Sequence, residues 1–518
     1  MTLADEFTRA VARAPDHVAI VEGARRLTWA AWDDEICAVA GGLARMGLTT
    51  GDYLVTVLSN RIETATLYWA CQRLGLVFTP FNWRAGPDEV AYVLTDAEAK
   101  AVVFEDRSRD AVLAAAETAG VPSNRLIALD EPGAAVPYAD LASSAPIALT
   151  EPVSADATAL MLYTSGTTGR PKGVPRSHAA EQAAAISCVA HLGYRFGDSQ
   201  LGVMPLFHTM GMRALLMSCF LNGKLVCLPS FDVDAALDLI GAEQISALFL
   251  VPTLFHDIVH HPGLDGRDLG CVQNIAYAGM SMTSALTARC AEIFKPRAFT
   301  NFYGSSEIYT FTTCDHVADK PGCAGRAGIG QEIRVVRADP DPVVGPDEVV
   351  APGEAGEIIA TMKSPEAFNG YWKRPEADAK AIRDGWYFTG DLGHFDADGE
   401  LYVVGRVDDM IISGGENIHP EEVEDVLATS PLVRQAAVIG IPSDRWGEKV
   451  IAFIEPAGPE ATTEVLDAHC LDSDLARFKR PRGYVFVESI PRSASGKLLR
   501  RKLRDGDYVQ LPNFEHTP

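Results

Sequence analysis

One run of twelve residues constrains this chain more than any other stretch: Tyr163-Thr-Ser-Gly-Thr-Thr-Gly-Arg-Pro-Lys-Gly-Val174. The apolar residues 159–163 come directly before it and predict a strand that leads into a loop. Glycines let the backbone of such a loop approach an anion closely, and hydroxyl groups add hydrogen-bond donors. The residues of these two kinds are Thr164, Ser165, Gly166, Thr167, Thr168 and Gly169. Together with the positive charge of Lys172, they predict a loop that binds a polyphosphate.

The run differs from the Walker A phosphate loop. That motif needs a glycine followed at once by Lys and then Ser or Thr. Here Gly169 is followed by Arg170, Pro171, Lys172 and Gly173. A short Gly/Ser/Thr fragment could equally be a flexible surface turn, but the length and order of this run favour phosphate binding.

Length and charge limit the classes of protein that the chain can belong to. With 518 residues it is too long for one core, so two or more domains are expected. A hydrophobic content of 47% and a charged content of 22% are typical of a soluble globular protein. The formal net charge of −24 argues against a nucleic-acid or anionic-membrane partner. Anionic substrates must therefore be met by local basic groups.

The cysteines and the N-terminus predict a cytoplasmic location. Ten cysteines are present and none forms a Cys-x-x-Cys pair, which indicates free thiols in a reducing compartment. The N-terminus is acidic and lacks the apolar core of a signal peptide. No uninterrupted apolar run is as long as a transmembrane helix.

Alternating strand and helix patterns predict an α/β fold with a large N-terminal domain. A helix is expected from about residue 30, where the apolar residues 36, 39, 40, 43 and 46 recur at helical spacing. Apolar runs predict buried strands at 53–58, 101–104, 125–129, 224–228 and 247–251. Histidines 256, 260 and 261 lack the Glu of a His-Glu-x-x-His zinc motif, so an exposed helix face is favoured over a metal site.

The pattern changes twice toward the C-terminus. Between 335 and 402, short strands and turns predict a small β-rich subdomain. We expect the N-terminal domain to consist of mixed sheets and this subdomain. Residues 420–427 then begin with Pro and acidic residues, which predicts a helix start, and strands are expected at 435–441 and 449–454. We therefore expect an N-terminal domain of residues 1–407 and a small α+β C-terminal domain of residues 408–518.

Several separate motifs make the chain resemble one superfamily nearly from end to end. Tyr163–Val174 closely resembles the phosphate loop of the adenylate-forming superfamily, which contains acyl-CoA synthetases, peptide-synthetase adenylation domains and luciferases. Further motifs are Pro205-Leu-Phe-His208, Tyr303-Gly-Ser-Ser-Glu307, Tyr387-Phe-Thr-Gly-Asp391, the run 405–418 and Pro491-Arg-Ser-Ala-Ser-Gly-Lys497. Within the superfamily the chain looks most like benzoate and 4-chlorobenzoate CoA ligases.

The resemblance implies a site for ATP and Mg²⁺. Glu307 corresponds to the family's Mg²⁺-binding carboxylate, which beside a triphosphate is useful only through a cation. Asp391 corresponds to the ribose ligand, Arg406 to a ribose or phosphate contact, and Lys497 to the residue that offsets charge in the transition state. Thr164 and His208 join Glu307 and Lys497 as catalytic candidates. The adenine-side residues are Ala278, Gly279, Asn301, Phe302, Tyr303, Gly304 and Ser305.

The resemblance also implies an acyl pocket and a coenzyme A site. The pocket residues are His208, Thr209, Met210, Phe249, Gly279, Phe302, Gly304, Ile308, Tyr309 and Thr310. Chlorobenzoate ligases have Met and Asn where Tyr309 and Thr310 stand, which leaves unsubstituted and hydroxylated aryl acids open. The coenzyme A candidates are Arg84, Gly414, Gly415, Trp446, Phe478, Arg480 and Arg482, and a surface basic patch is an equal alternative for them. Asp408 is expected to be the hinge on which the C-terminal domain rotates between half-reactions.

The function expected from these motifs is an ATP-dependent carboxylate–CoA ligase that forms an acyl-AMP intermediate. An aromatic, benzoate-type acid is the first choice, and a medium or long fatty acid is the second. An adenylation enzyme that loads a carrier protein is a rival, and a non-catalytic nucleotide-binding protein is disfavoured because Glu307 and Lys497 are both present. The expected partners are small molecules, namely the carboxylate, ATP and CoA, and a homodimer is allowed.

Overall fold

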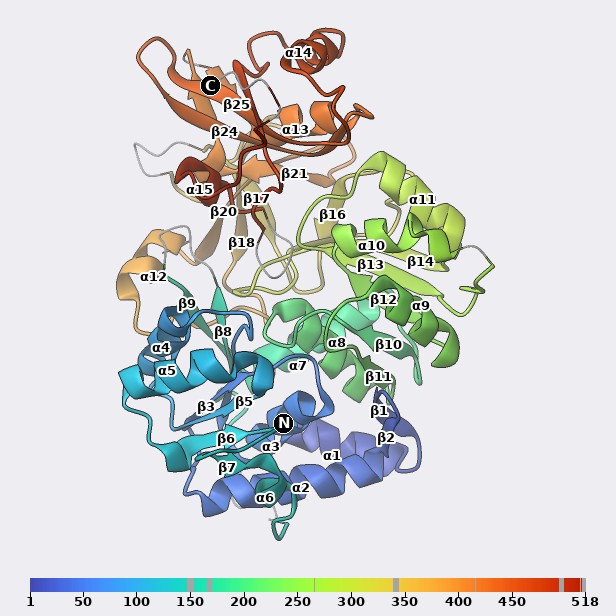
Figure 1. Ribbon diagram of the computed structural model, residues 1–518, viewed down its shortest axis with the longest axis vertical. Helices are drawn as coiled ribbons and strands as arrows, with labels where there is room; N and C mark the ends of the chain where they lie inside the picture. Colours follow the sequence, from blue (N-terminus) through green and yellow to red (C-terminus); the bar gives the residue numbers. More distant parts are fainter. Residues whose placement is uncertain are drawn as a thin grey trace. The chain divides into compact units, whose positions relative to one another are not determined.

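The computed structural model describes residues 1–146, 153–164, 170–264, 266–338, 344–414, 416–492, 498–512 and 514 (Figure 1). They divide into two compact units. The first consists of Met1–Glu332 and Thr361–Gly385, and the second consists of Ile333–Ala360 and Trp386–Pro518. Each unit is described by itself below.

A seven-stranded sheet in the first unit has the strand order β7-β6-β5-β3-β4-β8-β9. Its strands are parallel except for the antiparallel pair β8 and β9. Successive side chains of β3 pack into two different hydrophobic cores. Leu54 packs with residues of helices α2 and α3, and Val55 packs with residues of α4 and α5. Both faces of the sheet are therefore covered, as a parallel sheet requires, and Figure 1 shows α4 and α5 together on one of them. The strands are β3 Tyr53–Val57, β4 Val77–Pro80, β5 Ala101–Phe104, β6 Leu126–Ala128, β7 Val136–Pro137, β8 Thr158–Thr164 and β9 Lys172–Ser177.

A second run of strands in the first unit has the order β16-β15-β14-β13-β12-β10-β11-β1-β2. The strands from β14 to β1 pair in parallel, whereas β15, β16 and β2 are antiparallel to their neighbours. The strands are β1 Val18–Glu22, β2 Arg25–Thr28, β10 Ser199–Gly202, β11 Lys224–Cys227, β12 Ala247–Leu250, β13 Asn274–Ala278, β14 Ala298–Tyr303, β15 Thr312–Cys314 and β16 Cys323–Ala327.

Helices of the first unit pack on and between these sheets. They are α1 Leu3–Arg13, α2 Trp29–Arg45, α3 Ile62–Leu74, α4 Pro87–Asp96, α5 Arg109–Ala119, α6 Tyr138–Ala142, α7 His178–Leu192, α8 Thr209–Phe220, α9 Val233–Ala242, α10 Pro252–Val259, α11 Ser284–Phe294 and α12 Pro375–Ala381. Local signals explain where several of them begin. Thr2, Thr28 and Ser177 accept hydrogen bonds from backbone N–H groups in the first turns of α1, α2 and α7.

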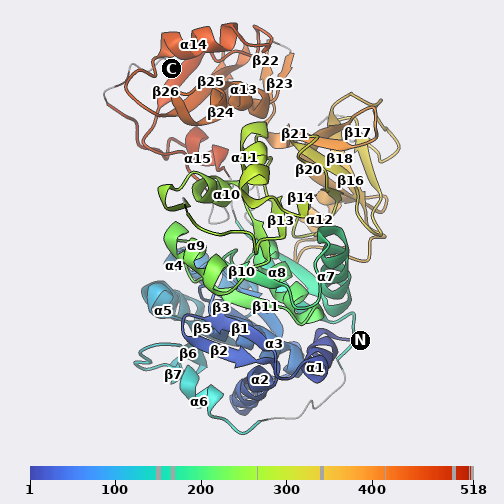
Figure 2. The same cartoon turned by 90° about the vertical axis from the view of Figure 1, so that its right-hand side faces the viewer.

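The second unit contains two groups of strands. The first group runs β17-β18-β20-β21. The second has the order β23-β22-β25-β24, with β26 beside β25. Helices α13 and α14 share a core with one face of the second group, and Leu503 of α15 packs with the opposite face (Figure 2). The elements are β17 Ile333–Val336, β18 Gly356–Thr361, β20 Trp386–Phe395, β21 Leu401–Arg406, β22 Ile411–Ser413, β23 Glu416–Ile418, α13 Pro420–Ala428, β24 Val433–Ser443, β25 Gly447–Pro456, α14 Thr463–Leu471, β26 Gly483–Phe486 and α15 Arg500–Arg504, whereas β19 Ile382–Arg383 belongs to the first unit.

The predicted α/β class with mixed sheets is confirmed, and so are the helices and strands expected from hydrophobic patterns. The predicted β-rich region needs one correction, because residues 361–385 in its middle contain helix α12 and belong to the first unit. The two compact units also divide the chain differently from the expected domains, since 333–360 and 386–407 group with the C-terminal residues. The boundary between 407 and 408 is expected to be the point about which the C-terminal domain rotates between half-reactions. That rotation stays a prediction.

The predictions drawn from the cysteines and histidines can be compared with the structure as well. All ten cysteines are free thiols, as expected. His256 on α10 and His260 directly after it are exposed, as predicted, whereas His261, expected on the same face, is half-buried and lies beyond the helix. Of the helices formed by the described ranges, none is both long enough and apolar enough to cross a membrane.

The first residue of α7 makes the first unit sensitive to acid. His178 is fully buried, and its Nδ1 accepts a hydrogen bond from the backbone N–H of Leu3 at 3.3 Å. Burial lowers the pKa of His178 from 6.5 to about 4. Between pH 6.5 and 4 the unfolded chain therefore binds a proton at this histidine that the folded chain does not bind.

We expect acid to destabilise the fold through this residue, by ~2 kcal/mol between pH 7 and pH 5. His178→Gln keeps an acceptor for Leu3 but removes the titration, so its unfolding midpoint in urea should fall less over this pH range. His256→Gln, at an exposed histidine, is the matched control. An equal pH dependence of the midpoint in His178→Gln and in the parent protein would contradict this account.

Candidate functional site

The phosphate-loop motif lies at the end of an antiparallel hairpin. Strands β8 and β9 pair so that Thr164 stands opposite Lys172 and Tyr163 stands opposite Gly173. Thr164 and Lys172 are the half-buried residues from which the loop leaves and to which it returns. The predicted ligands Ser165, Gly166, Thr167, Thr168 and Gly169 lie outside the described residues. The hairpin register therefore brings the two ends of this loop together.

A buried aromatic residue links Lys172 to Glu307. The Lys172 ammonium lies 4.5 Å from the centre of the Tyr371 ring. The Tyr371 hydroxyl donates a hydrogen bond of 2.7 Å to the Oε1 atom of Glu307. Lys172 and Glu307, the predicted phosphate and magnesium residues, are thus neighbours of the same side chain.

The backbone next to Tyr371 is attached to the hairpin and to a nearby helix. The N–H of Trp372 donates to the carbonyl of Gly173 at 2.9 Å, and the Tyr371 N–H donates to the Asp378 carboxylate at 2.7 Å. Gly370 has a φ of +105°, and a Cβ there would lie 2.8 Å from an oxygen of Asp378. This glycine lets the chain turn so that the Tyr371 ring lies under Lys172.

A tight turn holds the Glu307 carboxylate in place. The Ser305 N–H donates to the carbonyl of Ile308, and the Ser305 hydroxyl accepts from the N–H of Glu307. A Cβ at Gly304 would lie 1.8 Å from the carbonyl oxygen of Tyr309, so this turn closes only around a glycine. Glu307 is 7% exposed, which makes it a buried carboxylate.

A fully buried arginine, Arg176, holds the same turn in place through hydrogen bonds. Arg176 of β9 donates to the carboxylate of Glu181 at 2.8 Å and to the carbonyls of Glu307 at 3.0 Å and Glu366 at 2.5 Å. Its guanidinium carbon also lies 3.9 Å from the centre of the Tyr309 ring. Arg176 therefore joins the hairpin strand, helix α7 and two loops.

The predicted adenine-side residues come together at the ends of two parallel strands. Ala278 of β13 is the register partner of Phe302 of β14. Gly279 follows with a φ of +88°, and the half-buried Tyr303 ring lies 5.1 Å from that of Phe311. The Asn301 side chain donates to the carbonyl of Cys323 at 2.7 Å. Its amide group thus makes a structural hydrogen bond within the sheet.

The predicted acyl-side residues are mostly buried. Phe249 and Phe302 meet edge to face at 6.0 Å, and the guanidinium of Arg213 lies 4.3 Å from the centre of the Phe302 ring. His208 caps α8, because its Nδ1 accepts from the N–H of Met210 at 3.5 Å. Thr209 and Met210 follow in the first turn of that helix, and Ile308 and Thr310 have no exposed surface.

Tyr309 lies within the hydrophobic core of the first unit. It has no exposed surface, and its ring is stacked by Arg176 at 3.9 Å and by Arg213 at 4.8 Å. Arg213 also donates a hydrogen bond to the Tyr309 carbonyl. This packing gives Tyr309 a structural role in the described fold, and its contact with a bound acid stays a prediction.

In the second unit the two predicted ribose residues form a pair. Asp391 of β20 is the register partner of Arg406 of β21, and the guanidinium donates to the carboxylate at 2.5 Å. Gly390 has a φ of +72°, and a Cβ there would lie 2.9 Å from a nitrogen of Arg406. The Arg406 side chain therefore lies over Gly390 and is held by the carboxylate of Asp391, the next residue in the chain.

Three of the predicted coenzyme A residues lie together in the second unit. The Gly414 N–H donates to the Trp446 carbonyl at 2.7 Å, and the guanidinium of Arg482 lies 4.6 Å from the centre of the Trp446 ring. Arg480 instead forms an ion pair with Asp467, and Phe478 is exposed.

The remaining predicted residues have separate settings. Arg84, in the first unit, lies 4.0 Å above the Trp83 ring. Burial and the nearby Arg107 lower the pKa of Arg84. The predicted hinge residue Asp408 is exposed in a short 3₁₀ turn, Val407–Asp409. Gly415 and Lys497 lie outside the described residues.

Sequence reasoning missed Tyr371 and Arg176. The segment Asn369-Gly-Tyr-Trp372 carried a signal for the first, since a glycine before two aromatic residues indicates a turn that presents a ring. No local signal marks Arg176, because a charged residue in a strand is usually exposed and only the tertiary structure buries it.

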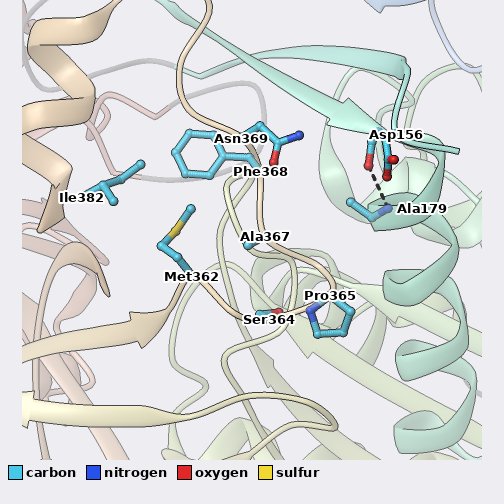
Figure 3. Close-up of a pocket in the computed structure, with 11 residues that line it drawn as sticks. Asp156, Ala179, Met362, Ser364, Pro365, Ala367, Phe368, Asn369 and Ile382 are labelled. Carbon is cyan, nitrogen blue, oxygen red and sulfur yellow. Dashed lines mark hydrogen bonds between the residues drawn. The ribbon is translucent and has the colours of Figure 1, made fainter. Parts of the chain in front are cut away.

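A separate cavity of about 350 Å³ also lies in the first unit (Figure 3). Its walls come from the start of α7, from residues 362–369 and from Ile382. None of the predicted site residues that the structure describes lines this cavity. One of its lining residues, Phe368, is linked to the site, because the Phe368 N–H donates to the Glu307 carbonyl at 2.9 Å.

These features describe an α/β protein in which Lys172 of the β8–β9 hairpin and the buried carboxylate of Glu307 contact the same tyrosine. The family model described as AMP-binding enzyme matches residues 7–372, and the model of the AMP-binding enzyme C-terminal domain matches residues 422–497. The chain belongs to the AMP-binding enzyme family, within the adenylate-forming superfamily.

Individual relatives are similar over almost their whole length. A feruloyl-CoA synthase from Amycolatopsis sp. is 33% identical over 498 residues, which cover 95% of this chain and 96% of the relative. The long-chain-fatty-acid–CoA ligase FadD13 from Mycobacterium tuberculosis is 31% identical over 94% of both chains. The crystal structure of ATP-bound MatB from Rhodopseudomonas palustris matches with a TM-score of 0.87 and 30% identity, over 98% of this chain and 99% of that one.

We expect Tyr371→Phe to weaken ATP binding about tenfold in the presence of Mg²⁺, because the variant loses a buried hydrogen bond to a charged group. Binding without Mg²⁺ should change little. Titration calorimetry with and without the metal measures both values.

Tyr53→Phe is the matched control. The Tyr53 ring lies 5.1 Å from that of Trp372, and within the described part of the chain its hydroxyl has no hydrogen-bond partner. Equal weakening in the two variants, or an effect of Tyr371→Phe that is independent of Mg²⁺, would show that Tyr371 does not act through Glu307.

Proposed function

We propose that the protein is an ATP-dependent carboxylate–CoA ligase that works through an acyl-AMP intermediate. In the first half-reaction a carboxylate oxygen attacks the α-phosphorus of ATP, and pyrophosphate leaves. In the second, the CoA thiol attacks the acyl carbon and AMP leaves. This chemistry needs no covalent nucleophile on the protein, because positioning and charge stabilisation are sufficient.

The single observation that carries this proposal is the contact chain Lys172–Tyr371–Glu307. It places the ammonium group of Lys172, from the phosphate hairpin, over the Tyr371 ring, and the buried carboxylate of Glu307 at the hydroxyl of the same ring. A cation and a metal-binding carboxylate side by side are what the polyphosphate of ATP needs.

The negative charge of Glu307, which no neighbouring basic residue of the described chain offsets, fits a magnesium site. Its carboxylate is buried, and none of the described basic residues lies within ion-pair distance of it. A buried carboxylate without a cation is unfavourable, and an Mg²⁺ ion carried in with ATP would supply the missing charge. When bound, the metal would neutralise charge on the phosphate oxygens.

Lys497 and the hinge complete the proposal. By resemblance, Lys497 stabilises the negative charge that develops at the α-phosphate, and the domain beyond Asp408 presents it in the first half-reaction. The exposure of Asp408 in the short 3₁₀ turn Val407–Asp409 supports this residue as the hinge, because hinges are usually a few residues at the ends of elements or in loops.

The substrate that we propose is an aromatic acid. The edge-to-face pair of Phe249 and Phe302 supports this class, because aromatic rings pack well against such walls. The similarity to a feruloyl-CoA synthase supports it too, whereas the similarity to a fatty-acid ligase keeps a long aliphatic acid as the alternative.

Free CoA is the proposed acceptor. Trp446, flanked by Arg482, offers an aromatic face and a positive charge for the nucleotide end of CoA. Ten free thiols support work in a reducing compartment, which for this protein we take to be the cytoplasm.

The experiment is a panel of benzoic, hydroxycinnamic and fatty acids, scored by pyrophosphate release with and without CoA. We expect aromatic acids to give the highest kcat/KM and thioester to form with free CoA. Lys497→Ala should lower acyl-AMP formation by at least ~10². The same variant should convert supplied acyl-AMP to thioester at nearly the parent rate.

Each other outcome corrects a different part of the proposal. A preference for fatty acids would overturn the aromatic assignment, and release of pyrophosphate without any thioester would indicate a carrier-protein acceptor. Equal loss of both half-reactions in Lys497→Ala would contradict its role. No carboxylate-dependent pyrophosphate release at all would overturn the function.

A further inference from the structure

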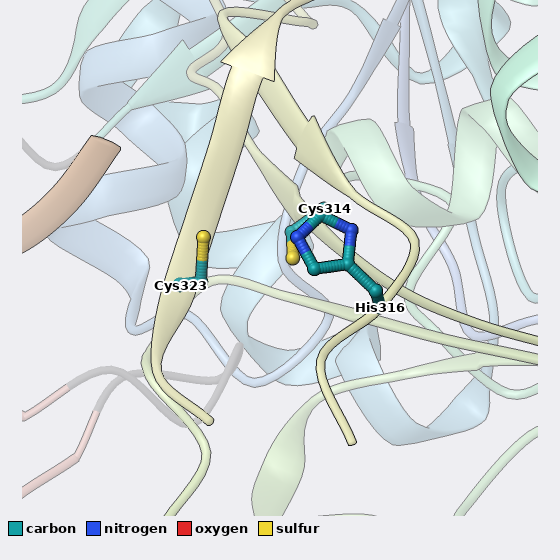
Figure 4. A group of neighbouring side chains, drawn as sticks. All are labelled: Cys314, His316 and Cys323. Carbon is teal, nitrogen blue, oxygen red and sulfur yellow. The ribbon is translucent and has the colours of Figure 1, made fainter. Parts of the chain in front are cut away.

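Three potential metal ligands meet at one end of the antiparallel pair β15 and β16. Cys314 is the last residue of β15, Cys323 is the first residue of β16, and His316 lies in the loop between them. The two Sγ atoms and a ring nitrogen of His316 all lie within 4.8 Å of one another. Figure 4 shows the three side chains gathered around one space. The chain spacing, Cys-x-His-x₆-Cys, matches none of the common zinc-finger patterns.

From this cluster we propose a metal site of the Cys₂His type that binds Zn²⁺ or another thiophilic cation. Tetrahedral Zn²⁺ holds thiolates at about 2.3 Å and histidine at about 2.0–2.1 Å, which separates the ligand atoms by about 3.5–3.8 Å. The cluster needs to contract by only about 1 Å to reach this arrangement, and small side-chain rotations are enough. The metal would be distinct from Mg²⁺, which prefers oxygen ligands.

Neighbouring groups favour the metal-binding forms of the ligands. The Gly325 N–H donates to the Cys323 sulfur at 3.2 Å, a contact that stabilises a thiolate. Gly325 has a φ of +85°, and a Cβ there would lie 1.9 Å from the Thr313 carbonyl oxygen, so a glycine is needed for this approach. The Nδ1 atom of His316 lies 3.0 Å from a carboxylate oxygen of Asp315, which is the usual partner that orients a metal-binding histidine. A metal would then be bound through the other ring nitrogen, Nε2.

The exposure of the three residues indicates a site that exchanges its metal with solvent. Both cysteines have no exposed surface, but the His316 side chain is 38% exposed. Three protein ligands leave the fourth position for water or an incoming ligand. Binding releases the thiol protons, so the apparent affinity rises with pH.

The site lies directly beside the strand that carries the predicted adenine-side residues. Cys314 is the register partner of Asn301, and the Asn301 amide donates to the carbonyl of Cys323. A bound cation would therefore help to hold β14, β15 and β16 together at this end of the sheet.

The test uses Co²⁺ as the probe on full-length protein that has been treated with a chelator and kept reduced. One equivalent should bind and produce a thiolate-to-cobalt charge-transfer band, and Zn²⁺ should displace it. Cys314→Ala, Cys323→Ala and His316→Gln should each weaken Co²⁺ binding at least ~10-fold. Cys290→Ala, at another buried thiol, is the matched control and should bind normally. His316 is part-exposed, so His316→Gln tests the site even if the cysteine variants fail to fold.

Three outcomes of the Co²⁺ titrations would overturn the site: no charge-transfer band, a band that survives in His316→Gln, or equal weakening in Cys290→Ala. A disulfide between Cys314 and Cys323 would also overturn it. In that case, denatured protein would contain two reactive thiols fewer than the ten of the sequence. Because Co²⁺ binding is measured without ATP or acid, failure here is independent of the proposed ligase activity.

Discussion

The buried guanidinium of Arg176 is the interaction on which the rest of the candidate site depends. Removing such a cation from water is costly unless hydrogen bonds and an opposite charge replace its hydration. Its partners are a carboxylate on α7, the carbonyl of Glu307 and the carbonyl of Glu366. These groups come from three separate stretches of the chain, so the hydrogen bonds of one side chain connect a side chain of α7 to the backbones of two loops. The carboxylate of Glu307 is held in place by this requirement as much as by its own turn.

The same structure explains how a strongly acidic protein can receive anionic substrates. With a net charge of −24, carboxylates would be expected to pair with most basic groups. At three predicted ligand positions the cation instead lies over an aromatic ring: Lys172 over Tyr371, Arg84 over Trp83 and Arg482 near Trp446. A ring holds a cation in position without neutralising it, so its charge remains available to a phosphate. Arg480, paired with Asp467, is the counterexample and is the weaker coenzyme A candidate.

Most of the fold was predictable from the sequence, because hydrophobic periodicity and capping residues act locally. The strand at Tyr53–Val57 and the helix at Pro420–Ala428 are examples. The resemblance supplied the roles of Glu307 and Asp391, and the structure shows what surrounds them. A turn at Gly370 could have been expected from the sequence, but the contact of Tyr371 with Lys172 and Glu307 could not, since it depends on hydrogen bonds of this segment to β9 and Asp378. The cluster of Cys314, His316 and Cys323 was missed because strand pairing, rather than motif spacing, brings its members together.

The central claim is that the carboxylate is activated as an acyl-adenylate, and oxygen transfer tests it most directly. The acid is labelled with ¹⁸O at both carboxylate oxygens and converted to product with ATP and CoA, and the AMP is then examined by mass spectrometry. If a carboxylate oxygen attacks the α-phosphorus, AMP must carry one ¹⁸O atom and the thioester must carry the other. Unlabelled AMP, or label in the released phosphate or pyrophosphate, would contradict the account.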